Sequence, residues 1–183
     1  MDYININKNS WNAKVDYHLK SDFYFVDEFI AGRTSLNEPE LELLGNVQGK
    51  KILHLQCHFG QDSISLARMG AEVTAVDLSD KAIVEARILA EKCGVEVNFI
   101  ESNVYDLPNV LEEKFDIVYT SYGVIGWLPD LEKWAKIIQR FLKPNGEFIM
   151  VEFHPVIWMF DDDFTKVAYD YQSTEPIVET YEG

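Results

Sequence analysis

The sequence is poor in cysteine and in basic residues. Two cysteines, Cys57 and Cys93, occur in 183 residues, which is too few for a disulfide framework and lacks the paired spacing of a structural metal site. A reducing cytoplasm is therefore the expected location. Lys and Arg number 16 against 31 Asp and Glu, giving a net charge of −15. This balance argues against a nucleic acid or an anionic membrane as the main partner and favours a small molecule.

Long apolar runs and a signal sequence are also missing. No apolar stretch approaches the length of a membrane span, and the N-terminal MDYININKNSW lacks a basic flank followed by an apolar core. We therefore expect a soluble protein. The content of apolar residues is 47%, enough to bury a core, and the length predicts a single domain over residues 1–183.

The chain is organised around residues 51–77, KILHLQCHFGQDSISLARMGAEVTAVD. An apolar run at 52–55 leads through a small-residue turn at 57–60 into apolar residues at helical spacing, which predicts strand, loop and helix. A second apolar run at 73–76 stops at a single carboxylate, Asp77. An acid about 20 residues after such a loop is typical of folds that bind ribose hydroxyls. A nucleoside-containing ligand is the first hypothesis.

Strands and helices are predicted to alternate over the rest of the chain. Three more strands are expected at 95–100, 116–120 and 148–153, and helices at 79–93 and 131–142, the latter ended by the segment 143–146. This order predicts an α/β fold with a doubly wound, mostly parallel Rossmann-like sheet and helices on both faces. Within the single domain we distinguish a preface at 1–48, a cofactor-binding core at 49–154 and a tail at 155–183.

The preface is rich in aromatic residues and is expected to form helices near 9–20, 22–31 and 40–44. One interpretation, which we favour, is that its aromatic side chains pack on one face of the sheet. The other is that the preface forms a lid, with Trp11, Tyr17 and Tyr24 pointing into a ligand pocket and excluding water.

Five segments in order resemble the class I S-adenosylmethionine-dependent methyltransferases over about 51–153. They are LHLQCHFG, AVDLS, SNVYDLP, FDIVYTSYG and LKPNGEF, and the string LQCHFGQD resembles a branch of the family whose substrate we do not assign. The family pattern has an acid where His54 stands and glycines where Gln56 and His58 stand, and only Gly60 remains. Because glycine lets the backbone approach a ligand, these exchanges imply a differently shaped pocket.

The resemblance implies S-adenosyl-L-methionine as the cofactor and S-adenosyl-L-homocysteine as the product. By this resemblance, the loop residues would lie against the methionine part of the cofactor, and Asp77 would accept hydrogen bonds from the ribose hydroxyls. Leu78 and Asn103 would contact the adenine, and Val104 would add a backbone contact. The end of the fourth strand would face the methyl group. The cofactor-binding residues expected are Gln56, Cys57, His58, Gly60, Asp77, Leu78, Asn103, Val104, Ser121 and Tyr122, with Trp11 and Tyr17 from the preface.

Methyl transfer from a sulfonium needs alignment more than proton transfer, so no catalytic base is obligatory. For an amine or hydroxyl acceptor a base would help, and the candidates are His154, Tyr122, His18 and Glu152. His54, inside an apolar strand, is expected to be a buried, hydrogen-bonded imidazole. The run Asp161 to Asp163 is expected to be a solvated loop, and no metal site is predicted.

We expect a methyltransferase that acts on a small-molecule acceptor. Two alternatives remain: a protein that binds an S-adenosyl ligand without transferring a methyl group, and an NAD-dependent oxidoreductase, against which the absence of G-x-G-x-x-G argues. After residue 153 the chain has little room for the two antiparallel strands that usually complete this fold. Either the chain is part of a longer protein, which we favour, or a partner subunit, as in a homodimer, covers the sheet edge.

Overall fold

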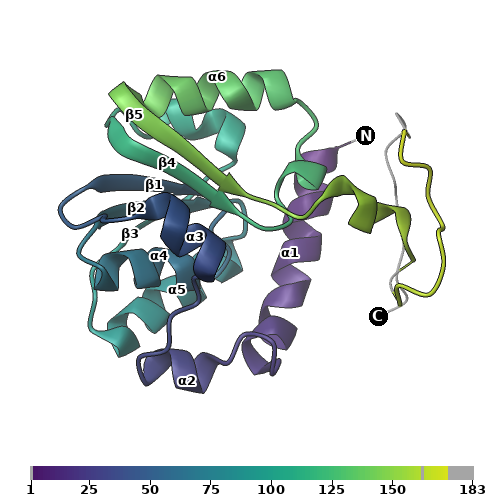
Figure 1. Cartoon of the computed structure of the whole chain (residues 1–183), viewed down its shortest axis with the longest axis horizontal. Coiled ribbons are helices and arrows are strands. Elements are labelled where there is room, and N and C mark those ends of the chain that lie inside the picture. The colour runs from purple at the N-terminus through teal and green to yellow at the C-terminus, as the bar shows by residue number, and fades with distance from the viewer. Residues whose placement is uncertain (1, 162, 173–183) are drawn as a thin grey trace. The chain divides into compact units, whose positions relative to one another are not determined.

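The computed structural model describes residues 2–161 and 163–172, in two compact units, Met1–Val151 and Glu152–Gly183. The first unit contains a five-stranded parallel sheet with the order β3-β2-β1-β4-β5 (Figure 1). Its strands are β1 (Lys51–Leu55), β2 (Glu72–Asp77), β3 (Asn98–Glu101), β4 (Phe115–Ser121) and β5 (Leu142–Val151). The predicted doubly wound sheet is confirmed.

The order of the strands reverses between β1 and β4, because β2 and β3 lie on one side of β1 while β4 and β5 lie on the other. Ile52, Leu53 and His54 of β1 pair in parallel with residues 117–119 of β4. Ligands of open α/β sheets bind beyond the carboxyl ends of the strands at such a reversal. The fold therefore directs attention to the segments that follow β1, β2 and β4.

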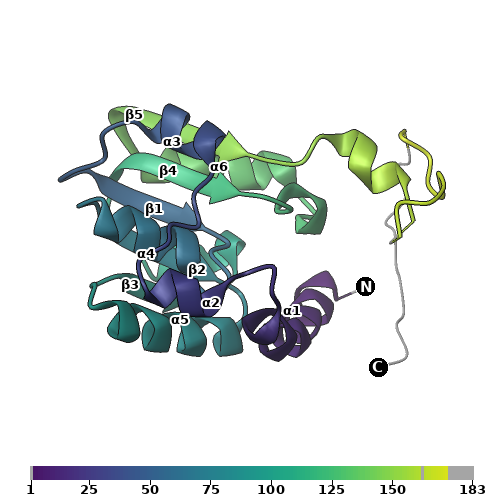
Figure 2. The ribbon, with the colours of Figure 1, turned by 60° about the horizontal axis from the view of Figure 1, so that its bottom comes forward.

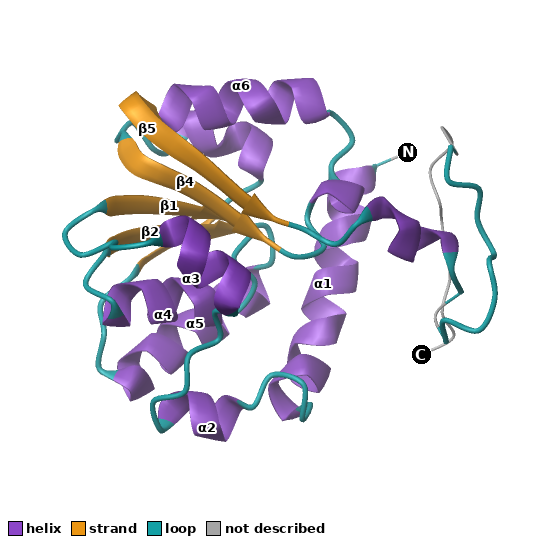
Figure 3. Ribbon diagram, viewed as in Figure 1, coloured by secondary structure: helices purple, strands orange, loops and turns teal. Residues whose placement is uncertain are grey.

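Helices cover both faces of the sheet (Figure 3). One buried cluster joins the sheet to α2 (Val26–Ile30), α3 (Glu38–Leu44), α4 (Gln61–Arg68) and α5 (Asp80–Cys93). The other joins the opposite face to α6 (Leu131–Phe141) and to the 3-10 turn η1 (Val104–Asn109). Among the described residues, no helix is long and apolar enough to span a bilayer.

Helix α1 (Tyr3–Lys20) is not part of either layer. Figures 1 and 2 both show it beside the strand ends to which the arrows point. The side chain of Asp2 caps this helix by accepting the backbone N–H of Asn5 at 3.2 Å. The preface thus crosses the edge of the sheet where a ligand is expected.

Several element boundaries differ from prediction, among them those of β3, which spans Asn98–Glu101 instead of 95–100. Helix α1 begins at Tyr3 because Asp2 provides the cap, whereas we expected a start near residue 9. Helix α2 spans only Val26–Ile30, because Phe25 before it has a left-handed φ of 46°. The segment 143–146, expected to separate helix from strand, lies within β5, whose pairing with β4 shifts register between Phe115 and Ile117.

The second unit has little regular structure in its described part. The 3-10 turn η3 (Pro155–Met159) is followed by an isolated antiparallel bridge between Phe160 and Val167. Asp161 is held by local contacts, since its carboxylate accepts the Thr165 hydroxyl at 2.8 Å. The expected loop of three acids includes Asp162, and the predicted tail includes 173–183; these residues lie outside the described part.

Candidate functional site

The loop after β1 keeps the backbone of a glycine-rich turn without its first two glycines. Gln56 and His58 have φ values of 54° and 51°, and Gly60 has 79°. Side chains rarely adopt this left-handed conformation, and each such residue costs about 1–3 kcal/mol unless its surroundings hold it. Strain at two nearby positions of one loop is a feature of functional sites, and it places this loop in the candidate site.

Asp77, at the end of β2, anchors the same loop. Its Oδ2 accepts the backbone N–H of His58 at 2.7 Å, and its Oδ1 accepts that of Ser79 at 2.8 Å. Burial raises the pKa of the Asp77 carboxyl, while the N–H groups of Ser79, His58 and Leu78 oppose the rise. A carboxylate oxygen accepts more than one hydrogen bond, so Asp77 retains acceptor capacity for a ligand.

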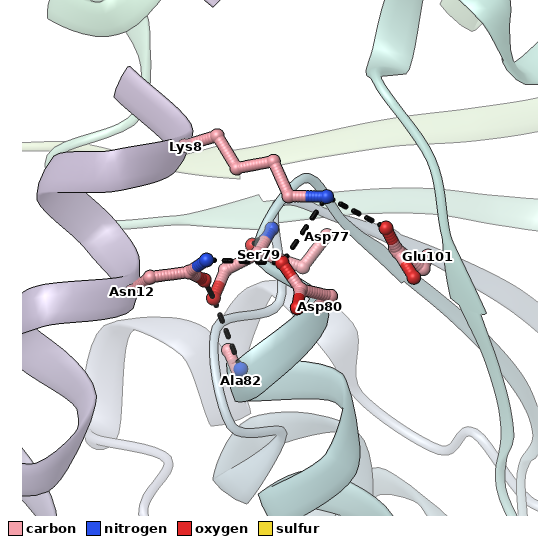
Figure 4. Close-up of polar contacts among 7 residues, drawn as sticks. All are labelled: Lys8, Asn12, Asp77, Ser79, Asp80, Ala82 and Glu101. Carbon is pink, nitrogen blue, oxygen red and sulfur yellow. Dashed lines mark hydrogen bonds and ion pairs between the residues drawn. The ribbon is translucent and has the colours of Figure 1, made fainter. Parts of the chain in front are cut away.

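Helix α1 is fastened directly beside Asp77 (Figure 4). The Ser79 hydroxyl donates to Asn12 Oδ1 at 2.5 Å and accepts the N–H of Ala82 at 3.0 Å, so one side chain caps α5 and holds α1. Asn12 also donates to Asp80 Oδ1 at 2.9 Å. Lys8 Nζ lies 3.1 Å from Asp80 and 2.7 Å from Glu101 Oε1. We call Lys8 and Asn12, with Ser79, Asp80 and Glu101, the α1 latch.

A second set of contacts joins α1 to the loop. His18 Nδ1 and His58 Nε2 are 2.9 Å apart and share a hydrogen bond. The rings of Trp11 and Tyr24 lie 5.2 and 6.0 Å from that of His58, in edge-on geometry. Burial lowers the pKa of His58 to about 3, with His18 and Lys14 adding to the effect. His58 is therefore a neutral imidazole at pH 7.

Two carboxylates, half-buried Asp62 and buried Glu40, hold the residues at the end of β4. The Ser121 hydroxyl donates to Asp62 Oδ2 at 2.7 Å. The Tyr122 hydroxyl donates to Glu40 Oε2 at 2.9 Å, and Glu40 Oε1 accepts the Tyr119 hydroxyl at 2.9 Å. Glu40 is 0% exposed, and Oε2 also accepts the backbone N–H of Asn37 in the capping box of α3. Tyr122 has a φ of 31°, a third strained position at this edge.

The predicted lid residues fall into two groups. Trp11 and Tyr24 contact the loop, and Trp11 also packs against Trp127, with ring centroids 5.3 Å apart. Tyr17 differs from the prediction: its side chain is 74% exposed, because it lies on the outer side of α1. Phe29 of α2 joins the core on one face of the sheet, whereas α1 lies beside the strand ends. The lid over a ligand stays a prediction.

Several predicted ligand contacts are already engaged within the chain. A Cβ on Gly60 would lie 2.7 Å from Phe99 Cε1, so this glycine makes room for a core ring. Asn103 uses its Oδ1 to accept the backbone N–H of Tyr105, capping η1, instead of leaving that oxygen for adenine. Val104 is buried in the core, and Leu78 is half-buried. Cys57 is buried, and burial raises its thiol pKa, which fits a small loop residue.

The histidines behave differently from one another. His54 is buried and its Nδ1 lies 2.8 Å from the Ser63 hydroxyl, which confirms the interpretation as a core imidazole. His154 is the N-cap of η3, where its Nδ1 accepts the N–H of Val156 at 3.2 Å. Among the candidate bases, His18 contacts the loop after β1, and Tyr122 is hydrogen-bonded to Glu40.

Sequence reasoning missed Asp62, Glu40 and the α1 latch. Asp62 directly follows the loop in the quoted string LQCHFGQD, so its position was a usable signal. Asn37 and Glu40 form the N-x-x-E pattern of a capping box, which also was readable. The contacts of Lys8 with Glu101 and of Glu40 with Tyr119 join residues 93 and 79 positions apart and left no local pattern.

The site fits a nucleoside cofactor on the evidence of its buried polar atoms. Gln56 Oε1 and His58 Nδ1 are buried and have no hydrogen-bond partner in the part of the chain that the structure describes. Buried polar groups without partners are rare in folded proteins and are commonly satisfied by a ligand or water. These atoms belong to the two strained loop residues, and the backbone N–H of one of them, His58, donates to the Asp77 carboxylate. Fold and site together define an α/β protein that binds a nucleoside-containing cofactor.

Comparison with known proteins narrows this class. The family model described as a methyltransferase domain matches residues 52–146, more than half of the chain, and the chain belongs to this family. An uncharacterized methyltransferase of Synechocystis is 33% identical over 133 residues, covering 72% of this chain and 60% of the relative. A ubiquinone biosynthesis O-methyltransferase of Alkalilimnicola ehrlichii is 34% identical over 108 residues, covering 59% of this chain and 43% of the relative.

Solved structures agree on the fold. The PH0226 protein of Pyrococcus horikoshii is 32% identical, with a TM-score of 0.58 over 73% of this chain and 56% of that one. A structure described as a DhpI-SAH complex is 21% identical and has a TM-score of 0.62. The match covers 87% of this chain and 71% of that one, and it shows the shared fold. The cofactor of this family is S-adenosyl-L-methionine. The chain spans about half the length of the curated relatives, 60%, 47% and 43% for the first three.

Proposed function

We propose that the protein transfers a methyl group from S-adenosyl-L-methionine to a small-molecule acceptor by in-line displacement. The observation that carries the proposal is the strained loop after β1 held by Asp77 at the end of β2, beside the reversal of the sheet. When bound, the cofactor supplies an electrophilic methyl group on a sulfonium. The chain's part is to bind, orient and exclude water.

The residue roles follow from these contacts. Asp77 would accept the ribose hydroxyls with the acceptor capacity left by its two N–H bonds, and Gln56 and His58 would meet the methionine part with their unpaired atoms. The Asn103 side-chain amide and Leu78 would lie against the adenine. Helix α1, through Trp11, would cover the cofactor and exclude water, which strengthens every polar contact beneath it.

No general base is required, and the structure favours none strongly. Burial and then the Glu40 contact raise the pKa of Tyr122, so this phenol keeps its proton, which it donates to Glu40, and does not serve as a base. Burial lowers the pKa of His18, which leaves a neutral imidazole at pH 7. The acceptor is proposed to be neutral or cationic because the chain is strongly acidic. A cytoplasmic location is part of the proposal and is supported by the two free cysteines.

Calorimetry with S-adenosyl-L-homocysteine and with NAD tests the proposal. We expect the first to bind and the second not to. Binding of NAD alone would replace the methyltransferase with an oxidoreductase. Binding of S-adenosyl-L-homocysteine without methyl transfer to any acceptor in a screen of small amines, phenols and thiols with labelled cofactor would favour the alternative of a binding protein.

Substitution of Asp77 locates the site. Asp77→Ala should weaken the binding of S-adenosyl-L-homocysteine by about 1.5–3 kcal/mol, the range for hydrogen bonds to a charged group. Asp116→Ala is the matched control, because Asp116 lies at the start of β4 and pairs with Lys143 at 2.9 Å. Equal affinity in the native protein and Asp77→Ala would move the ligand away from β2.

A further inference from the structure

Helix α1 meets the loop after β1 through a contact between two imidazoles. His18 Nδ1, near the C-terminal end of α1, lies 2.9 Å from His58 Nε2. At this distance the two nitrogens share one hydrogen, which one ring donates and the other accepts. The contact therefore exists with two neutral rings or with one imidazolium. It does not exist with two, because each nitrogen would then carry its own hydrogen.

Neighbouring groups hold both rings in place. Asp77 accepts the backbone N–H of His58 at 2.7 Å, which fixes the loop. The Tyr24 hydroxyl lies 3.4 Å from His18 Nδ1. The ring of Trp11 packs edge-on against both imidazoles, with centroids 6.2 Å from that of His18 and 5.2 Å from that of His58. These contacts restrict the rotation by which two imidazoliums could avoid each other.

The charged surroundings of the pair do not compensate a second positive charge. The titratable groups that face it come from α1, from the segment after α1 and from β2, and are Lys14, Tyr17, Tyr24 and Asp77. Burial lowers the pKa of both histidines, and Lys14 adds to the effect. The Asp77 carboxylate accepts the backbone N–H of His58 and not its ring. Among the described residues, no carboxylate forms an ion pair with either imidazole.

The ion pairs of α1 keep their charge between pH 5 and pH 7. Lys81 Nζ lies 2.7 Å from Asp16 and lowers the pKa of its carboxyl. Asn12 and then Lys8 lower the pKa of Asp80. Carboxyl groups with a pKa below about 4 are ionised throughout this range, whereas histidine, with an ordinary pKa of about 6.5, changes its charge within it. Acidification therefore acts on the two imidazoles and leaves these ion pairs intact.

We propose that His18 and His58 form a pH-sensitive switch, which holds α1 against the loop while at most one ring is protonated and releases α1 in acid. A histidine whose pKa is lower in the closed state binds protons more tightly in the open one, so closure loses stability as the pH falls below about 6.5. Release of α1 would also free a ligand at the strand ends. That consequence rests on the proposed function, whereas the switch itself does not.

Hydrogen exchange of the α1 amides, measured by mass spectrometry without ligand, tests the switch. The rates are corrected for the intrinsic effect of pH and compared with those of β1, which report global unfolding. From pH 7 to pH 5, a histidine with a pKa of about 6.5 in the open state and a much lower one in the closed state favours opening by about 25-fold. Opening of α1 in the native protein should therefore increase by about 25- to 600-fold, the range for one and two such histidines.

His18→Asn removes one titrating group and keeps the contact. The amide of asparagine occupies about the position of Nδ1 and hydrogen-bonds His58 in any protonation state. This variant should reduce the increase to about 25-fold or less, the limit for the one histidine that remains. Lys8→Met is the matched control, because it weakens the α1 latch and leaves both imidazoles. It should favour opening by about two- to fivefold at both pH values and keep the native dependence on pH.

An increase below about 25-fold in the native protein, or the same increase in the native protein and His18→Asn, would overturn the switch. If His18→Asn leaves α1 unprotected already at pH 7, His58→Gln carries the same comparison, since its amide replaces Nε2.

Stopped-flow release of S-adenosyl-L-homocysteine tests the consequence for the ligand. Release should be faster at pH 5 than at pH 7, and His18→Asn should reduce the difference. A rate independent of pH, although α1 opens, would contradict the coupling of α1 to the ligand. If this ligand does not bind at all, the proposed function fails, while the exchange of ligand-free α1 still decides the switch.

Discussion

At the scale of single residues, the site is defined by side chains kept in unfavourable states. Gln56 and His58 occupy backbone conformations that suit glycine, and Asp62 and Asp77 are carboxyl groups whose pKa values burial raises. Such features reduce stability and persist where function requires them. Their concentration after β1 and β2 separates this edge of the sheet from the rest of the molecule.

The raised carboxyl pKa values predict a pH dependence of stability. A group whose pKa is higher in the folded state binds protons more tightly there, so the free energy of unfolding falls as the pH rises from about 4 through the raised value. Asp62→Asn removes the contribution of Asp62 to this pH dependence. The variant should therefore gain stability relative to the native protein between pH 4 and pH 7, measured by urea unfolding without ligand.

Asp116 should contribute a pH dependence of stability of the opposite sign. Lys143, and then the N–H of Lys51, lower its pKa, so its contribution is present above the unfolded value and is lost as the pH falls through the folded one. Asp116→Asn should lose stability relative to the native protein as the pH rises from below the folded pKa of Asp116 to about 4, and the difference should change little between pH 4 and pH 7. A constant difference between the native protein and Asp62→Asn across the range would contradict the buried charge.

At the scale of elements, the loop after β1 depends on a close contact with β3. Gly60→Ala should destabilise the protein by about 2–4 kcal/mol, because it adds an overlap with Phe99 to the cost of a left-handed alanine. Gly94→Ala is the matched control, with a φ of 67° and nothing within 4 Å of its Cβ, and should cost about 1 kcal/mol. Equal losses in urea unfolding would mean that the overlap relaxes freely.

The α1 latch predicts a kinetic effect. Lys8→Met removes ion pairs worth about 0.2–1 kcal/mol each, so S-adenosyl-L-homocysteine should dissociate about two- to fivefold faster in stopped-flow measurements at low salt. The difference should shrink at 0.5 M salt because screening weakens exposed pairs. Lys136→Met, which breaks the pair with Glu132 on α6, should not change the rate. An unchanged rate in Lys8→Met would mean that α1 does not limit release.

Local patterns in the sequence account for most of the elements. Ser79 and Gly94 bound α5 as expected, and the apolar runs of β1 and β2 are correct to within one residue. The position of α1 was not readable, because contacts such as Lys8 with Glu101 depend on the folded arrangement. For the same reason the occupied oxygen of Asn103 and the outward side of Tyr17 could not be predicted.

At the scale of the whole molecule, the core lies within the first unit. Every residue of both buried clusters precedes residue 150, and the sheet ends at Val151. A chain ending at Val151 should therefore fold on its own, with cooperative urea unfolding and far-UV circular dichroism of an α/β protein. Non-cooperative unfolding of residues 1–151 would mean that the second unit contributes to the fold of the first.

The central claim is that Asp77 and the loop after β1 hold the adenosyl cofactor. The most direct measurement is a crystal structure of the complex with S-adenosyl-L-homocysteine. We expect both ribose hydroxyls within about 3 Å of the Asp77 carboxylate and the amino-acid end against Gln56. Density for the ligand at another part of the sheet, or a ribose without contact to Asp77, would contradict the account.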